Sequence, residues 1–204
     1  MTSEETVDPA RHAEKMKKKQ AARAKIMAGK TDQKGLVIVH TGTGKGKTTA
    51  ALGMICRSLG HGYKVALIQF IKGAMATAEK VVFDMFPEQM EMRPMGEGFT
   101  WNTQDRDRDI AKAREAWEAA KARILDPEWK LVVCDELNIV LRYDYLSVEE
   151  VIEVLQQKPE DTHVVITGRN APQALIDFAD LVTEMTMVKH PFRSGIKAQP
   201  GIEF

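Results

Sequence analysis

The sequence predicts an α/β protein with a mostly parallel β-sheet and helices on both faces. Strands buried on both faces are typically continuous apolar runs, and four such β-rich runs occur: Leu36–Val39, Val65–Ile71, Leu131–Cys134 and Val164–Thr167. Longer segments with helical periodicity lie between them, and alternation of strand and helix is typical of parallel sheets. The composition agrees, because 44% hydrophobic and 28% charged residues are ordinary for a folded globular chain.

Helix signals mark the segments that separate or follow these strands. Four segments carry them: Thr48–Leu59, Asp105–Leu125, Ser147–Gln157 and Pro172–Asp180. The third begins with a capping box of Ser147 and Glu150, and the fourth has Pro172 at its start. Residues 73–104 fit the alternation less well and predict a long, partly irregular insertion. Such loops at the carboxyl ends of strands in open α/β sheets commonly bind ligands.

A basic arm precedes the predicted sheet. Residues 1–34 hold nine Lys or Arg and five Asp or Glu, a charge of 9 − 5 = +4 within a chain of net charge zero. Residues 9–28 favour a helix with a thin apolar stripe. We therefore divide the chain into an arm, residues 1–34, and an α/β domain, residues 35–204. The arm is either a solvated segment or a lid that docks over a site or a neighbouring subunit.

Composition also limits the compartment and the partners. The two cysteines, Cys56 and Cys134, lie in apolar segments, which excludes a disulfide framework and a cysteine-rich metal site. The sequence contains no 18-residue apolar run and no secretory signal, so we expect a cytoplasmic protein without a membrane partner. A nucleic-acid partner usually requires a basic face, and the only dense basic cluster is the segment from Arg11 to Lys25 in the arm. The charge pattern of the α/β domain therefore disfavours nucleic acid as a partner.

A glycine-rich loop follows the first predicted strand. The stretch HTGTGKGKTT at 40–49 stands between a strand and a helix, the context of a phosphate-binding loop. Its glycines allow backbone N–H groups to approach phosphate oxygens, Lys47 adds a charge, and the Thr48 hydroxyl is a ligand for Mg²⁺. The usual loop has a glycine at the place of Thr41, whereas here Gly42 comes one residue later. This shortened loop, with Lys45 as an additional cation, predicts a nucleotide site and leaves the reaction open.

Charged residues follow two of the other predicted strands. The strand at 131–134 ends in Asp135 and Glu136, which places Asp135 near a magnesium ion at the loop. Glu136 would activate water in a hydrolytic ATPase, or hold ribose hydroxyls in an enzyme that does not hydrolyse ATP. Arg169 follows the strand at 164–167 and could contact the far end of a polyphosphate. The simpler alternatives are carboxylates that cap the next segment and an arginine in a surface turn.

Seven sequence blocks together resemble one enzyme family, the ATP:corrinoid adenosyltransferases of the CobA/BtuR (CobO) class. The blocks, in order, are TGTGKGKTTAALG at 41–53, QFIKG at 69–73, GFTWNTQ at 98–104, VVCDELN at 132–138, DYL at 144–146, VVITGRN at 164–170 and VKHPFRSGIKAQPGIEF at 188–204. Many families share a phosphate loop. Its shortened form together with the GFTW block and the C-terminal tail is specific to this one.

The resemblance implies a P-loop NTPase-like (RecA-like) sheet, usually in a homodimer. It implies that Co(I) of a reduced corrinoid, cob(I)alamin or cobinamide, attacks the 5′-carbon of ATP and releases tripolyphosphate. Mg²⁺ would accompany ATP, and an electron-donor protein such as a reduced flavoprotein would supply Co(I). Because Co(I) is already a strong nucleophile, the protein needs only to position the substrates, stabilise the leaving group and exclude water.

The resemblance also assigns roles to individual residues. It implies that the triphosphate is held by Gly42, Thr43, Gly44, Lys45, Gly46, Lys47, Thr48 and Thr49. Arg169 would neutralise it further, Asp135 would share the magnesium ion with Thr48, and Glu136 would hold the ribose. ATP would lie in the reverse direction along the loop, which agrees with the displaced glycine. Phe99 and Trp101 would press on the lower face of the corrin and remove its axial ligand; alternatively, both pack as core aromatics.

Two other functions fit the residues alone. A RecA-like ATPase would hydrolyse ATP with Glu136 as base and use the arm to bind a protein or nucleic acid. A regulatory module would bind the nucleotide without chemistry. The products of ATP distinguish the three: tripolyphosphate for the adenosyltransferase, ADP and phosphate for the ATPase, and neither for the module.

Overall fold

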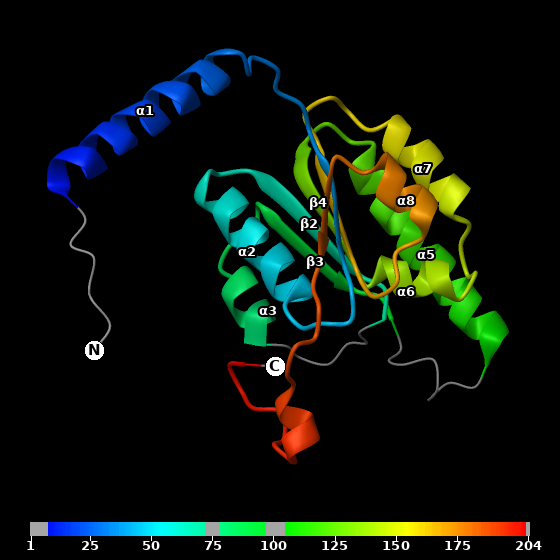
Figure 1. Cartoon of the computed structure of the whole chain (residues 1–204). Coiled ribbons are helices and arrows are strands. Elements are labelled where there is room, and N and C mark those ends of the chain that lie inside the picture. Colours follow the sequence, from blue (N-terminus) through cyan, green and yellow to red (C-terminus); the bar gives the residue numbers. More distant parts are fainter. Residues whose placement is uncertain (1–7, 72–77, 97–104, 203–204) are drawn as a thin grey trace. The chain divides into compact units, whose positions relative to one another are not determined.

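The structure is a computed structural model that describes residues 8–71, 78–96 and 105–202 (Figure 1). It contains two compact units, Met1–Gln33 and Lys34–Phe204. The first unit contains helix α1, Pro9–Ala28, which has Pro9 at its start and no buried residue. Asp8 caps this helix, because its carboxylate accepts a hydrogen bond from the backbone N–H of Ala10.

The second unit is built on a six-stranded sheet with the order β3-β2-β4-β5-β1-β6. The strands are β1 (Val37–Thr41), β2 (Lys64–Gln69), β3 (Met90–Pro94), β4 (Trp129–Asp135), β5 (His163–Thr167) and β6 (Leu181–Glu184). Every neighbouring pair among these strands is parallel. The predicted parallel sheet is therefore confirmed, and each of the four predicted strands is present within two residues of its expected bounds.

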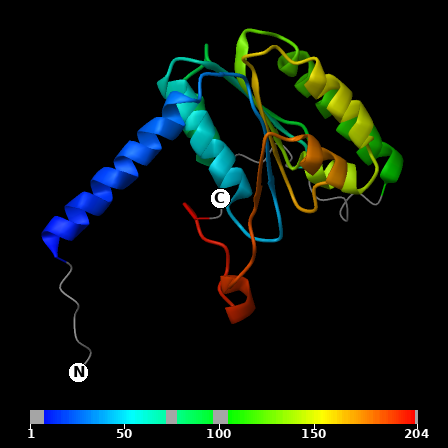
Figure 2. The same ribbon diagram turned by 45° about the horizontal axis from the view of Figure 1, so that its top comes forward.

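Helices cover both faces of this sheet, as predicted (Figures 1 and 2). One face packs against α2 (Lys47–Gly60) and α3 (Ala78–Phe83) through strand residues such as Ile38, Leu67 and Val133. The other face packs against four helices through the alternate strand residues: α5 (Arg106–Ile124), α6 (Leu137–Arg142), α7 (Val148–Gln156) and α8 (Gln173–Phe178). Continuous apolar runs are thus explained by burial of both faces.

The described part of the predicted insertion at 73–104 combines regular and irregular segments. Helix α3 and strand β3, neither of which was predicted, lie within it, and residues 84–89 and 95–96 belong to neither a helix nor a strand. Two further elements were not predicted: helix α6 directly after β4, and strand β6. Both β3 and β6 are edge strands whose side chains are only partly buried, so neither is a continuous apolar run. A short 3₁₀ helix, Pro191–Ser194, follows β6.

None of the described helices combines the length and hydrophobicity that a bilayer span requires.

Candidate active site

The glycine-rich loop connects β1 to α2, and its backbone requires glycine for two different reasons. Gly42 and Gly46 have positive φ angles of 94° and 103°, a region that favours glycine. Gly44 is needed because its backbone approaches the chain beyond β6: a Cβ atom there would lie 2.7 Å from the carbonyl oxygen of Met185. The N–H of Gly44 donates to that same oxygen at 2.6 Å. The backbone of Met185 therefore contacts the loop at Gly44 and supports it.

Lys47 is held inside the loop. Its ammonium donates to the carbonyl oxygens of Gly42 at 2.8 Å and Gly44 at 2.6 Å, and the residue is 7% exposed. Burial lowers the pKa of Lys47, and the charge of Glu136 opposes this shift, whereas Arg169 and Lys45 reinforce it. Glu136, Arg169 and Lys45 therefore lie near enough to Lys47 to affect its pKa, so four of the five charged residues predicted for the site lie around one position.

Asp135 is the centre of a buried hydrogen-bond network beneath the loop. The hydroxyl groups of Thr48 and Thr167 donate to its Oδ1 at 2.8 Å and 2.7 Å, and the Gln69 amide donates to Oδ2 at 3.2 Å. Asp135 has no exposed surface. The two residues predicted to share a magnesium ion, Thr48 and Asp135, therefore lie in direct contact although 87 positions separate them.

The donor set suits a magnesium ion that arrives with a nucleotide. Mg²⁺ prefers hard oxygen ligands and commonly takes one or two from the protein, with waters and phosphates completing the octahedron. Thr48 and Asp135 supply such oxygens, and the buried Oε1 atom of Gln69 accepts no hydrogen bond within the described residues. The described part of the chain has no cluster of three His, Cys, Asp or Glu side chains that could hold a metal ion by itself.

Glu136 is the N-cap residue of helix α6, and its backbone adopts a left-handed conformation with a φ of 64°. Non-glycine residues rarely adopt this conformation, and it is often found at functional sites. The N–H of Glu136 donates to the Thr167 hydroxyl at 2.9 Å, so Thr167 connects the backbone of Glu136 to the carboxylate of Asp135. A Cβ atom on Gly168 would lie 3.1 Å from Oε2 of Glu136, so the two residues lie side by side.

The turn after β5 lies beside the phosphate loop. The N–H of Gly168 donates to the His40 carbonyl at 3.2 Å, and the N–H of Ala171 donates to the Thr41 hydroxyl at 3.0 Å. Arg169 lies between these two contacts and is exposed. Within the loop itself, the exposed residues are Thr43, Lys45, Gly46 and Thr49. Phe99 and Trp101, which were predicted to contact the corrin, lie outside the described residues.

Sequence analysis did not identify three polar residues of this site: Gln69, Asn138 and Thr167. Gln69 and Thr167 each end a strand next to β4, and Gln69 pairs with Asp135 in the sheet. Asn138 is fully buried in α6, and its amide donates to the carbonyl of Gly168 at 3.1 Å. A polar residue at the end of an apolar run is a signal of a functional site that the sequence shows. Which residues lie beside it depends on the strand order, and the apolar pattern does not reveal that order.

Comparison with known proteins relates the chain to one enzyme family. Residues 33–204 match the family described as ATP:corrinoid adenosyltransferase BtuR/CobO/CobP. A corrinoid adenosyltransferase from Sinorhizobium sp. is 60% identical over 97% of this chain and 93% of its own length. A second one, from Pseudomonas aeruginosa, is 52% identical over 95% of this chain and 96% of its own. One from Escherichia coli K12 is 44% identical over 85% and 87%.

A solved structure supports the fold. The flagellar accessory protein FlaH from Methanocaldococcus jannaschii aligns with a TM-score of 0.52 over 76% of this chain and 73% of that chain. Their sequence identity is 9%, so the likeness concerns the fold alone. The predicted α/β fold, a parallel sheet with helices on both faces, is confirmed.

Proposed function

The chain belongs to the ATP:corrinoid adenosyltransferase family, and from this premise we propose the reaction at atomic level. Co(I) of a reduced corrinoid, cob(I)alamin or cobinamide, donates its electron pair to the 5′-carbon of ATP. A cobalt–carbon bond forms as the bond between that carbon and the α-phosphate oxygen breaks. The electron pair of the broken bond leaves with tripolyphosphate.

Three cations carry this proposal: Lys45 and Lys47 belong to the loop, and Arg169 lies in the turn that hydrogen-bonds to His40 and Thr41 beside it. A leaving tripolyphosphate concentrates negative charge, and preorganised cations stabilise such charge without reorganisation. In this proposal the backbone N–H groups of the glycine-rich loop, residues 42–49, donate to the phosphates, apart from that of Gly44, which donates to Met185. Mg²⁺, held by Thr48 and Asp135, would neutralise further phosphate charge. Glu136 then holds the ribose hydroxyls, because no water needs to be activated.

The remaining roles rest on the family resemblance. We propose that Phe99 and Trp101 press on the lower face of the corrin, which leaves cobalt four-coordinate and easier to reduce. The arm, residues 1–34, serves as a lid on the α/β domain, residues 35–204, in a homodimer. An electron-donor protein, such as a reduced flavoprotein, supplies Co(I). Both cysteines are free, which agrees with a cytoplasmic location.

The decisive experiment identifies both products. Purified protein, ATP, Mg²⁺ and chemically reduced cob(I)alamin are mixed without oxygen or light, visible absorbance is recorded, and phosphorus NMR identifies the phosphate product. We expect a light-sensitive alkylcobalamin and stoichiometric tripolyphosphate. ADP and phosphate without a cobalt–carbon bond would instead establish the RecA-like ATPase. Binding of ATP without any product would establish the regulatory module.

A second experiment tests the corrin-face residues. We expect Trp101→Ala to lose most activity when the reaction starts from cob(II)alamin with a weak reductant. The same variant should keep its activity when supplied with prereduced cob(I)alamin, which serves as the internal control for folding. Full activity from cob(II)alamin would exclude the proposed role of Trp101.

A further inference from the structure

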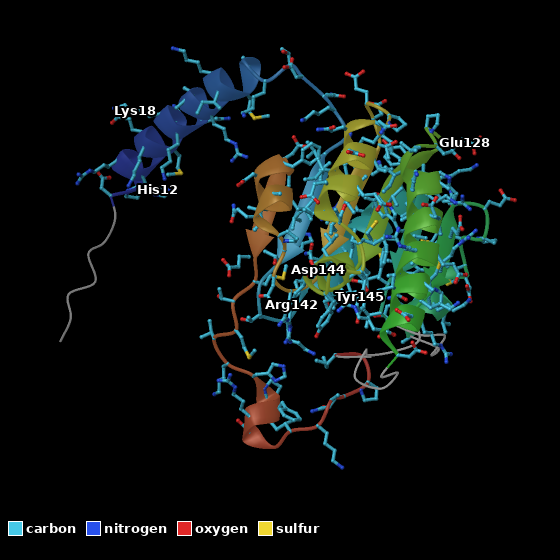
Figure 3. The ribbon with its side chains drawn as sticks, turned by 90° about the vertical axis from the view of Figure 1, so that its right-hand side faces the viewer. His12, Lys18, Glu128, Arg142, Asp144 and Tyr145 are labelled. Carbon is cyan, nitrogen blue, oxygen red and sulfur yellow. The ribbon has the colours of Figure 1, made fainter. Side chains whose placement is uncertain are left out.

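Asn138 is a fully buried amide in the first turn of α6, and the proposed reaction gives it no role. Its neighbours on the helix, Leu137, Val140 and Leu141, belong to the hydrophobic core. Arg142, labelled in Figure 3, marks the other end of this helix. A buried amide lowers stability unless its hydrogen bonds are made, so the partner of Asn138 indicates what the residue does.

The partner of Asn138 is the turn after β5. The amide Nδ2 donates to the carbonyl oxygen of Gly168 at 3.1 Å, and the buried Oδ1 accepts no hydrogen bond within the described residues. The two residues are also in close contact, because a Cβ atom on Gly168 would lie 2.9 Å from Cβ of Asn138. The side chain of Asn138 is therefore directed at the backbone of this turn.

The carbonyl that Asn138 binds belongs to the same peptide group as the N–H of Arg169. Because a peptide group is planar, a hydrogen bond to its oxygen also fixes the direction in which the next residue begins. Gly168 has a φ of 129°, and a glycine restricts its own backbone least of all residues. Asn138 therefore orients the backbone from which the Arg169 side chain extends.

The same turn is held on its other side by β1, the strand that precedes the phosphate loop. The N–H of Gly168 donates to the His40 carbonyl at 3.2 Å. The N–H of Ala171 donates to the Thr41 hydroxyl at 3.0 Å. Arg169 is exposed, so core packing does not order its side chain. Its direction depends on these backbone contacts and on the contact from α6.

Asn138 also relates Arg169 to Glu136, the residue proposed to hold the ribose. Glu136 precedes Asn138 by two positions, and its Oε2 would lie 3.1 Å from a Cβ atom on Gly168. The proposed reaction breaks the bond between the ribose carbon and the phosphate that Arg169 neutralises. A displacement of about 1 Å between groups at the two ends of such a bond can lower the rate about 100-fold.

We infer that Asn138 is a positioning residue: through the carbonyl of Gly168 it holds Arg169 toward the departing tripolyphosphate while Glu136 holds the ribose. Asn138 acts through the turn and does not contact the substrate. This inference rests on the proposed function, since it assigns a further residue to the same reaction.

Asn138→Ala removes the donor. We expect kcat with prereduced cob(I)alamin and the affinity for tripolyphosphate with Mg²⁺ each to fall about tenfold, with the KM for the corrinoid unchanged. The matched control is Thr162→Val. Thr162 is 1% exposed, and its hydroxyl donates at 3.1 Å to the carbonyl of Trp129, the first residue of β4. The control loses a similar buried bond far from the loop, so its kcat and its tripolyphosphate affinity should equal those of the wild type.

The pH dependence of Asn138→Asp separates a lost hydrogen bond from lost packing. A carboxylate cannot donate to the carbonyl of the turn, whereas a protonated carboxyl can. Burial and the carboxylates of Asp135 and Glu136 favour the protonated form, and the cations Lys47 and Arg169 oppose it. We expect the kcat of this variant relative to wild type to rise about threefold from pH 8 to pH 6. The same ratio for Asn138→Ala should stay constant.

A double-mutant cycle tests the path through Arg169. In the Arg169→Ala background, Asn138→Ala should lower kcat by less than about twofold. A tenfold loss in both backgrounds would overturn the inference, and so would a wild-type kcat for Asn138→Ala or a constant ratio for Asn138→Asp. Unfolding curves establish that each variant is folded at the assay temperature.

Failure of the proposed function is recognised separately. It would appear as absence of adenosyl transfer by the wild type itself. Tripolyphosphate binding is measured without turnover, so the comparison of Asn138→Ala with Thr162→Val tests the positioning role in either case.

Discussion

The phosphate-loop region and the surface between the end of α6 and the start of α7 both carry polar residues, but they hold them differently. Around the loop, Asp135 is fully buried with three donors, and Lys47 donates to two carbonyl groups. On the surface between α6 and α7, Arg142 and Glu149 are exposed. Bonded, buried groups are fixed before the substrate arrives, whereas exposed groups lose conformational freedom on binding. We therefore expect substitutions in the loop region to change turnover and stability, and substitutions of these exposed residues to change stability little.

The largest effect is expected at Lys47. Lys47→Ala removes a cation that the loop holds next to the bound triphosphate, and loss of one such group typically lowers kcat by about 10²–10³ fold. Adenosylcobalamin formation under saturating ATP measures this effect. Lys64→Ala, which removes a partly exposed lysine at the start of β2 that pairs with Glu128, is the control and should retain full activity. If Lys47→Ala retained normal ATP affinity and turnover, the assignment of the phosphate loop would be wrong.

A glycine pair tests the support of the loop by residue 185. In Gly44→Ala the new methyl group would meet the carbonyl oxygens of Met185 and Thr186 at 2.7 Å, and we expect a loss of about 1–3 kcal/mol in stability. The control is Gly53→Ala on α2, where nothing lies within 4 Å. That substitution should stabilise the helix by up to about 1 kcal/mol. Denaturant unfolding without ATP measures both, and equal stability of the two variants would contradict this account.

Thr167 is expected to position the two carboxylate residues rather than to contact the substrate. Thr167→Val leaves the N–H of Glu136 without its acceptor and removes a donor from Asp135, so we expect kcat to fall about tenfold. The Mg²⁺ concentration required for half-maximal activity should rise. Thr167→Ser retains the hydroxyl, so its kcat and its Mg²⁺ concentration for half-maximal activity should match those of the wild type. A loss of activity that serine does not restore would indicate a packing effect of the methyl group instead.

The smallest expected effect concerns pH. His40 is 6% exposed at the base of the loop, and burial lowers its pKa below 6.5. The unfolded chain then binds more protons than the folded chain below pH 6.5, so the free energy of unfolding falls as the pH falls. Burial also lowers the pKa of His163. His40→Gln should therefore reduce, without abolishing, the pH dependence measured between pH 7.5 and 5.5; an unchanged slope would exclude His40 as a contributor.

The elements that sequence analysis predicted correctly are those with strong local signals. The four central strands are continuous apolar runs, and Ser147 caps α7 by accepting from the N–H of Glu150, as the capping box predicts. Helix α6 was missed because its six residues are too few to display helical periodicity. Strand β6 was missed because it is short, lies at the edge and is half exposed.

The sequence by itself determined the fold class, the shortened phosphate loop and the family, because each depends on residues that are close along the chain or on motifs in a preserved order. Only the tertiary structure decided which groups meet. Thr167 reaches Asp135 across 32 positions because β5 lies beside β4, and Gly44 meets Met185 because β6 lies beside β1. Strand order arises from packing between distant segments, and hydrophobic pattern alone does not distinguish between alternative orders of equally apolar strands.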